Sequence, residues 1–241
     1  MISLEPLRGL PELRPGDDLA AVLASAAAEL RPTDVLAVAH KVVSKAEGRV
    51  VRLEDVTPGP RARALAAEHG KDPRHVEVIL SETAELVRAD AGRLICRTHH
   101  GFVCANAGVD ASNAGAPGTL VLLPEDPDAS ARALRARLGA AVVVTDSFGR
   151  AWRHGQCEIA IGCAGLAPLE DWRGRPDDDG RTLAATVIAI ADEVAAAADL
   201  VRGKDSREPA VRVRGLERHV LAGDGLGAAA LVRARETDLF R

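Results

Sequence analysis

Residues 142–162 constrain the fold more than any other stretch of the sequence. The uninterrupted apolar run at 141–144 is typical of a strand buried on both faces of a sheet. Thr145, Asp146 and Ser147 follow it without a spacer. We therefore expect a buried strand whose end carries a functional site in the adjoining loop, because a rigid strand fixes the position of the loop that follows it.

The residue types at this strand end suit the binding of charged groups. Asp146 and Ser147 supply hard oxygen atoms of the kind that Mg²⁺ and Mn²⁺ prefer. Arg150 and Arg153 supply forked donors that fit phosphate or carboxylate groups, so we take them as candidate catalytic residues. A solvated turn after a strand is the alternative interpretation of the same residues.

The composition limits the class of protein. Hydrophobic residues make up 47% of the chain and aromatic residues only 2%, so Ala, Val, Leu and Ile must fill the core. A net charge of −4 and a pI of about 6.0 argue against a nucleic-acid-binding surface. Without a run of 18 apolar residues or a signal pattern, we expect a cytoplasmic protein that does not enter the membrane.

Periodicity, proline and capping signals predict the remaining elements. Strands are expected at 2–7, 34–43, 94–103, 158–162 and 211–216, and helices at 19–31, 58–70, 72–83, 129–138 and 182–202. Residues 170–181, with three consecutive aspartates, are expected to form a solvated loop. The chain shows neither a repeat nor a disordered linker, so we expect two interleaved subdomains forming one compact unit over residues 1–241.

Two further segments carry candidate ligands. The expected strand at 34–43 and its exit loop bear two lysines and a serine, Lys41, Ser44 and Lys45, that would suit phosphate oxygens; a solvated strand end is the alternative. Asp110 and Asn113 supply one charged and one neutral oxygen ligand in a stretch of small residues. The nearby Cys96, His99, His100 and Cys104 are zinc-ligand types, but alternation along a strand would place the two histidines on opposite faces, which disfavours zinc.

Taken together, these stretches resemble the coenzyme F-420-0:L-glutamate ligase family, the γ-glutamyl ligases of deazaflavin coenzyme synthesis. The resemblance covers nearly the whole chain. It is carried by GLPELRPGDDL (9–19), DVLAVAHKVVSKAEGRVV (34–51), HGFVCANAGVDASN (100–113), VVVTDSFGRAWRHGQCEIAIGCAG (142–165), DLVRGKDSREPAVRVRGL (199–216) and LVRARETDLF (231–240).

The resemblance implies an α+β fold, a homodimer, and a GTP-dependent ligase that joins L-glutamate to F-420-0 through an acyl phosphate. It also implies two divalent cations, Mg²⁺ or Mn²⁺, with K⁺ as a further candidate. Asp110, Asp146 and Ser147 match the metal ligands. The positions that match GTP contacts are Leu10, Pro11, Glu12, Leu13, His40, Lys45, Asn113, Gly203, Lys204, Asp205 and Ser206.

The sequence departs from the family pattern at three places. His40 stands where serine is common, Ser147 stands where threonine is common, and residues 203–209 are more charged than usual. The sequence ends soon after 231–240, so we expect a ligase without the nitroreductase-like flavin domain that some relatives carry. Two alternatives stay open: a nucleotide-dependent amide ligase with another acceptor, and a non-catalytic deazaflavin- or nucleotide-binding module.

Overall fold

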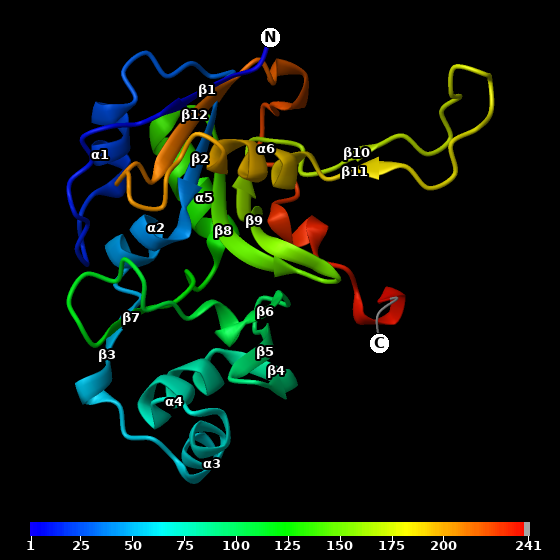
Figure 1. Ribbon diagram of the computed structural model, residues 1–241. Helices are drawn as coiled ribbons and strands as arrows, with labels where there is room; N and C mark the ends of the chain where they lie inside the picture. The colour runs from blue at the N-terminus through cyan, green and yellow to red at the C-terminus, as the bar shows by residue number, and fades with distance from the viewer. Residues whose placement is uncertain (239–241) are drawn as a thin grey trace.

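A five-stranded sheet forms the centre of the larger part of the structure, a computed structural model that describes residues 1–238 (Figure 1). Leu239 and Phe240, the last residues of the motif at 231–240, lie outside the described residues. The strands β2 and β8 are parallel, and all other neighbours in this sheet are antiparallel. Across the sheet the order is β1 (Ser3–Pro6), β12 (Ala210–Arg214), β2 (Val35–Ala39), β8 (Ala141–Arg150) and β9 (Arg153–Ala164).

Helices cover both faces of this sheet, which explains why its central strands are apolar without alternation. Leu36 and Val38 of β2 point into the cluster formed with α1 (Leu19–Ala26), α2 (His40–Ala46) and α5 (Pro127–Leu138). Val35 and Ala37 point the other way, into the cluster formed with α6 (Ile190–Asp199). Successive residues of a strand alternate between faces, so each face of β2 is buried by a different layer.

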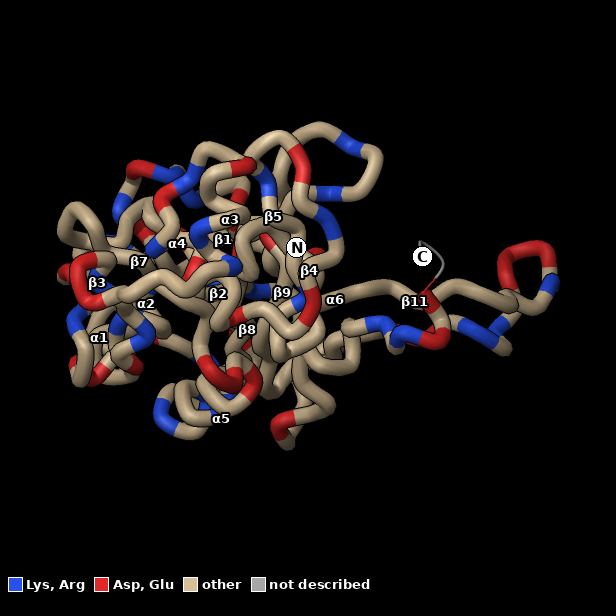
Figure 2. The backbone as a smooth tube through the Cα atoms, turned by 90° about the horizontal axis from the view of Figure 1, so that it is seen from below, with Lys and Arg blue, Asp and Glu red and all other residues tan. Residues whose placement is uncertain are grey.

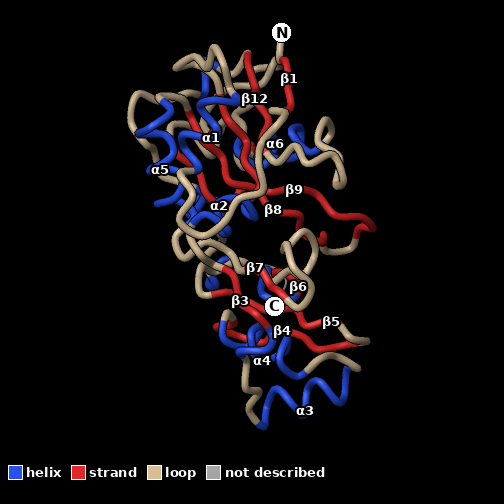
Figure 3. The backbone as a smooth tube through the Cα atoms, turned by 90° about the vertical axis from the view of Figure 1, so that its left-hand side faces the viewer, coloured by secondary structure: helices blue, strands red, loops and turns tan. Residues whose placement is uncertain are grey.

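The chain between α2 and α5 builds a smaller part with its own core around Ile79, Leu94 and Leu120. Figure 3 shows it below the larger sheet. Its elements are β3 (Val50–Arg52), α3 (Pro60–His69), α4 (Pro73–Ser81), β4 (Thr83–Asp90), β5 (Arg93–Thr98), β6 (Val103–Ala105) and β7 (Thr119–Val121). Helices and mainly antiparallel sheets together confirm the α+β fold; the division into two interleaved subdomains stays a prediction.

Residues 170–188 form an arm that projects from the larger part, with acidic and basic segments along it (Figure 2). β10 (Glu170–Asp171) pairs with β11 (Val187–Ile188) at its base. The expected helix at 182–202 is therefore wrong over its first half, since α6 begins only at Ile190. The backbone of Leu183 and Thr186 bonds instead to Arg175 and Trp172 on the other side of the arm.

Several other elements differ from expectation. The expected strand at 34–43 ends at Ala39 and continues as helix α2, so His40 and Lys45 lie on a helix. The expected helix at 19–31 ends at Ala26, and Glu29 adopts a positive φ of 65°. Strands β3, β4 and β7 were not expected. The expected strand at 94–103 is wrong as a single strand, because the chain turns back between β5 and β6, which pair with each other. Helices α3, α4 and α5 are confirmed, each with proline in its first turn.

Within residues 1–238, no helix is both long and apolar enough to cross a bilayer.

The close packing of β9 against the start of α5 gives a stability prediction. A Cβ at Gly162 would lie 2.2 Å from the carbonyl oxygen of Pro127. Gly162→Ala should therefore lower the free energy of unfolding by about 1–3 kcal/mol, the usual cost of overpacking. Gly149→Ala is the matched control, because a Cβ there meets no atom within 4 Å. Urea unfolding measures both, and equal stabilities for the two variants would contradict the packing argument.

Candidate functional site

The pairing of β2 with β8 brings distant segments to one place. The two strands are parallel, and Ala39, the last residue of β2, pairs with Thr145 in the middle of β8. The start of α2 therefore lies beside Asp146. Antiparallel β12 begins at Ala210, opposite Val38, so the loop at 203–209 reaches the same edge.

Asp146 and Ser147 lie inside β8 and not in a loop after it, so that expectation was wrong. The strand passes an irregularity after Val144 and continues to Arg150, because β9 pairs with it along this whole length. Ser147 is opposite Glu158 in this pairing. Asp146 and Ser147 therefore face opposite sides of the strand and meet different partners.

Asp146 faces helix α2. The Nε2 atom of His40 lies 3.3 Å from Oδ1 of Asp146, without the alignment of a hydrogen bond. The next residue, Lys41, reaches into the smaller part of the chain. Its Nζ lies 2.5 Å from Oδ2 of Asp110 and donates to Oγ of Ser112 at 2.8 Å and to the Ser112 carbonyl oxygen at 3.0 Å. Two consecutive residues of α2 thus contact the two aspartates.

Ser147 faces a group of buried charges. Its Oγ donates to Glu158, and the Nζ of Lys204 lies 2.5 Å from that hydroxyl and 3.1 Å from Oε1 of Glu158. Arg202 lies 2.7 Å from Oε2 of the same carboxylate and donates to Oγ1 of Thr145 at 3.1 Å. The carboxylate of Glu158 therefore has positive charge on both oxygens.

Asn113, close to Asp110 in sequence, contacts the segment that contains Lys204. Its Nδ2 donates to the backbone oxygen of Lys204 at 3.5 Å. We call the resulting set of side chains the polar ring, in which each member contacts the next or is close to it in sequence: Asp110, Lys41, His40, Asp146, Ser147, Lys204 and Asn113. The structure thus brings together residues from both parts of the chain that the sequence had marked separately.

The other predicted nucleotide contacts lie in loops beside the polar ring. Glu12 pairs with Lys45 of α2, whereas Leu13 is buried in the core. Ser206 donates to the carbonyl oxygen of Gly203 at 2.9 Å, so residues 203–206 form a tight turn that includes Asp205. Leu10 packs against the core and Pro11 is exposed. An ion pair of 3.0 Å between Arg8 and Glu208 joins the two loops.

The candidate catalytic arginines do not reach the polar ring. Arg150 and Arg153 pair at the exposed tip of the β8–β9 hairpin. Arg150 donates to the carbonyl oxygen of His154 at 2.6 Å. In the part of the chain that the structure describes, neither has a hydrogen bond or ion pair with a member of the ring, and their role stays a prediction.

Sequence reasoning missed several residues of the site. Glu158 and Arg202 form its most buried ion pair. Lys41 was expected to meet phosphate, and its contact with Asp110 was not expected. A signal for Glu158 existed, because a single carboxylate begins an otherwise apolar expected strand. A charge in such a position is almost never buried unless it is paired. Arg202 carried no comparable signal.

The buried carboxyl groups of Glu158 and Asp110 stay ionised at neutral pH. Burial alone would raise the pKa of Glu158, but the Arg202 charge and the Ser147 hydrogen bond outweigh it and hold that pKa below its ordinary value. Burial likewise raises the pKa of Asp110, and hydrogen bonds from Lys41 and Ser112 bring it below the ordinary value. Asp110 of the ring and the neighbouring Glu158 are therefore carboxylates and not carboxylic acids.

The Asp110–Asp146 side of the ring fits a hard divalent cation. Within residues 1–238, no three His, Cys, Asp or Glu side chains form a metal centre by themselves. Mg²⁺ bound together with a phosphate group needs only one or two protein carboxylates. Oδ2 of Asp146 accepts no hydrogen bond or ion pair from any described residue, so one carboxylate oxygen there is free to bind a cation.

The four zinc-ligand types do not assemble into a site. Burial raises the pKa of Cys104 to about 12, so its thiol stays protonated at neutral pH. Burial also raises the pKa of Cys96. His99 lies 3.1 Å from the carbonyl oxygen of Ser81, and His100 lies 2.9 Å from a different carbonyl oxygen. Each of the four side chains is engaged elsewhere.

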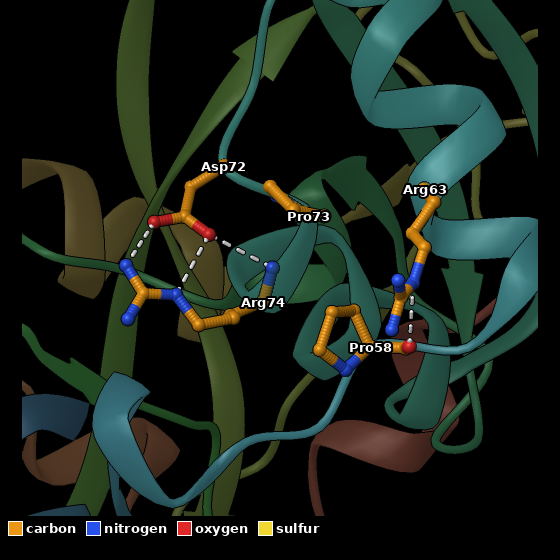
Figure 4. Close-up of a pocket in the computed structure, with 5 residues that line it drawn as sticks. All are labelled: Pro58, Arg63, Asp72, Pro73 and Arg74. Carbon is orange, nitrogen blue, oxygen red and sulfur yellow. Dashed lines mark hydrogen bonds and ion pairs between the residues drawn. The ribbon is translucent and has the colours of Figure 1, made fainter.

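An open hollow between α3 and α4 is separate from the polar ring (Figure 4). It measures about 490 Å³ and is lined by Pro58, Arg63, Asp72, Pro73 and Arg74. Asp72 and Arg74 form a forked ion pair, and this hydrogen bonding lowers the pKa of Asp72 to about 2. The charges of Asp72 and Arg74 satisfy each other, so this pair offers no free charge to a ligand.

The buried pair of Glu158 and Arg202 gives a pH-dependent prediction. Glu158→Gln leaves Arg202 buried without its partner and should cost about 3–5 kcal/mol at pH 7. Because the folded-state pKa of Glu158 is lowered, its contribution is complete above the ordinary value of 4.5 and is lost as the pH falls through the folded-state pKa. Urea unfolding at pH 7 and pH 3 should show the difference from the unmodified chain shrinking in acid.

Glu54→Gln is the control for this prediction, since the Glu54–Arg52 pair is exposed and such pairs contribute about 0–1 kcal/mol. A Glu158→Gln deficit that is as large at pH 3 as at pH 7 would show that the carboxylate charge is not its cause.

Known proteins are similar to this chain over nearly its whole length. The profile of the family described as F420-0:Gamma-glutamyl ligase matches residues 9–215. A protein of Methanopyrus kandleri named coenzyme F420:L-glutamate ligase is 46% identical over 248 residues, covering 100% of this chain and 98% of its own length. Proteins of the same name from Methanothermobacter thermautotrophicus and Halobacterium salinarum are 44% and 47% identical, covering 100% and 97% of this chain and 99% and 93% of their own lengths. The chain belongs to the F420-0:gamma-glutamyl ligase family.

Proposed function

We propose that this protein is a GTP-dependent ligase that joins L-glutamate to coenzyme F-420-0, releasing GDP and phosphate. Its family and the names of its relatives support the ligase and its two substrates. The observation that carries the proposal is the polar ring, in which Asp110 pairs with Lys41, Asp146 lies beside His40, and Lys204 contacts Ser147. Such a set of charges suits the transfer of a phosphoryl group, where charge neutralisation is the main task.

The reaction needs an activated acyl group, because a carboxylate does not react with an amine in water. We propose that the terminal carboxylate of F-420-0 attacks the γ-phosphorus of GTP, giving an acyl phosphate and GDP. The α-amine of glutamate then attacks the acyl carbon. Inorganic phosphate leaves, the amine loses a proton and an amide bond remains. A further glutamate can join through the side-chain carboxylate of the first, giving γ-linked forms.

The residues around the ring divide these tasks. Asp110 and Asp146 would hold a divalent cation, Mg²⁺ or Mn²⁺, which when bound offsets the charge of the phosphate oxygens. Lys45 lies on α2 with His40 and Lys41, and its ammonium group suits a phosphate oxygen. The segments 10–13 and 203–206, with Asn113, would contact the nucleotide.

Arg150 and Arg153 are our candidates for the carboxylates of F-420-0 or glutamate. Both lie on the hairpin whose strand β8 carries Asp146 and Ser147, and both are exposed.

We also propose a cytoplasmic homodimer, as the resemblance to the family implies. Light scattering of the purified chain would measure its mass, and a monomer would contradict the dimer.

Mass spectrometry of the deazaflavin product tests the function. The purified chain is incubated with F-420-0, L-glutamate, GTP and Mg²⁺ or Mn²⁺, and GDP release is followed in parallel. We expect a mass gain of one or more glutamyl units that requires both GTP and metal. GDP release without glutamylation would indicate an amide ligase with another acceptor. Nucleotide binding with neither GDP nor product would indicate a binding module.

Asp146→Asn tests the metal-binding side of the ring. The amide keeps the size of the side chain but loses its charge, and one such electrostatic contact is worth roughly a hundred- to a thousand-fold in rate. We expect turnover to fall by that factor in the glutamylation assay while the urea unfolding midpoint is retained. Asp90→Asn is the control, because Asp90 is exposed on β4 and its carboxylate pairs with the exposed Arg88, away from the ring. Near-normal turnover of Asp146→Asn would refute the assignment.

A further inference from the structure

The ammonium group of Lys204 sits among oxygen atoms on the Ser147 side of the polar ring. Its Nζ lies 2.5 Å from Oγ of Ser147, 3.1 Å from Oε1 of Glu158 and 3.5 Å from Oδ1 of Asp199. These oxygens come from β8, from β9 and from the end of α6. The resemblance to the family implies a metal ion bound to Ser147, and this structure has a positive charge there already.

The charges on this side are balanced. Glu158 and Asp199 contribute two negative charges, and Arg202 and Lys204 contribute two positive charges. Arg202 cannot easily leave, since its side chain is 7% exposed and it donates to Thr145 and to the carbonyl oxygen of Pro209. A divalent cation at Ser147 would therefore meet no net negative charge from these side chains and would be repelled by the buried guanidinium group of Arg202.

The Asp146 side differs in this respect. Among its carboxylate and ammonium groups, Asp110 and Asp146 are negative and only Lys41 is positive. One negative charge remains, and Oδ2 of Asp146 has no partner among the described residues. The two sides of β8 are therefore electrostatically unequal, and only one of them attracts a metal ion.

We propose that this enzyme uses a single divalent cation, on the Asp110–Asp146 side, and that Lys204 supplies the positive charge at Ser147 in place of a second ion. The proposal rests on the ligase function proposed above. An ammonium group on the chain is always present at that position, whereas an ion must bind from solution. Residues 203–209, more charged than is usual in the family, thus carry part of the site's electrostatics.

Counting bound Mn²⁺ tests the proposal. Free Mn²⁺ is followed by electron paramagnetic resonance during titration of the chain saturated with a non-hydrolysable GTP analogue. The unmodified chain should hold one Mn²⁺ per nucleotide site, and Lys204→Gln and Lys204→Glu should hold one more. Lys204 is 68% exposed, so both variants should fold, which urea unfolding verifies. Lys71→Gln, which removes a lysine charge from the segment between α3 and α4, should bind as the unmodified chain does.

Two Mn²⁺ ions in the unmodified chain would overturn the proposal, and so would equal counts in the chain and both Lys204 variants. The glutamylation assay separates this result from the function. Product formation by a chain that holds two ions would leave the ligase standing and reject the role of Lys204. One ion without product would reject the ligase.

Discussion

The parallel pairing of β2 with β8 is the constraint on which the site depends. It sets Ala39 opposite Thr145, and the next residue after each of them is a candidate site residue, His40 after β2 and Asp146 within β8. A slip of one residue would move every side chain of a strand to the opposite face. Because both faces of this sheet are buried by different helices, the packing of the core fixes the register and with it the geometry of the polar ring.

Adjacent residues of a single strand serve two different environments. Asp146 faces a helix and an aspartate from the smaller part of the chain, while Ser147 faces a buried network of carboxylates and cations. The alternation of a strand, which elsewhere separates core from solvent, here separates a side with net negative charge from a side whose charges balance. The unequal electrostatics of the site follow directly from this backbone geometry.

The sequence predicted those features whose causes are local. Helices α3, α4 and α5 have proline at the start, and α3 and α5 end at a left-handed glycine, so their signals lie within a few residues. The prediction of a helix was wrong over the first half of 182–202. The apolar spacing there also suits an extended segment, which pairs with residues 170–175 on the other side of the arm. Asp146 and Ser147 were found from one motif, whereas the pairing of Glu158 with Arg202 depends on which strands meet, and no local pattern records that.

The contacts that close the polar ring also join the two parts of the chain. Lys41 holds Asp110, and Asn113 holds the backbone of Lys204, so each contact crosses from the larger sheet to the smaller part. The distances between the residues of the site therefore depend on how the two parts of the chain pack together, and not on either part alone. Substitutions that loosen the small core around Ile79, Leu94 and Leu120 would alter that spacing from a distance, and defects in stability and in chemistry would arise together there.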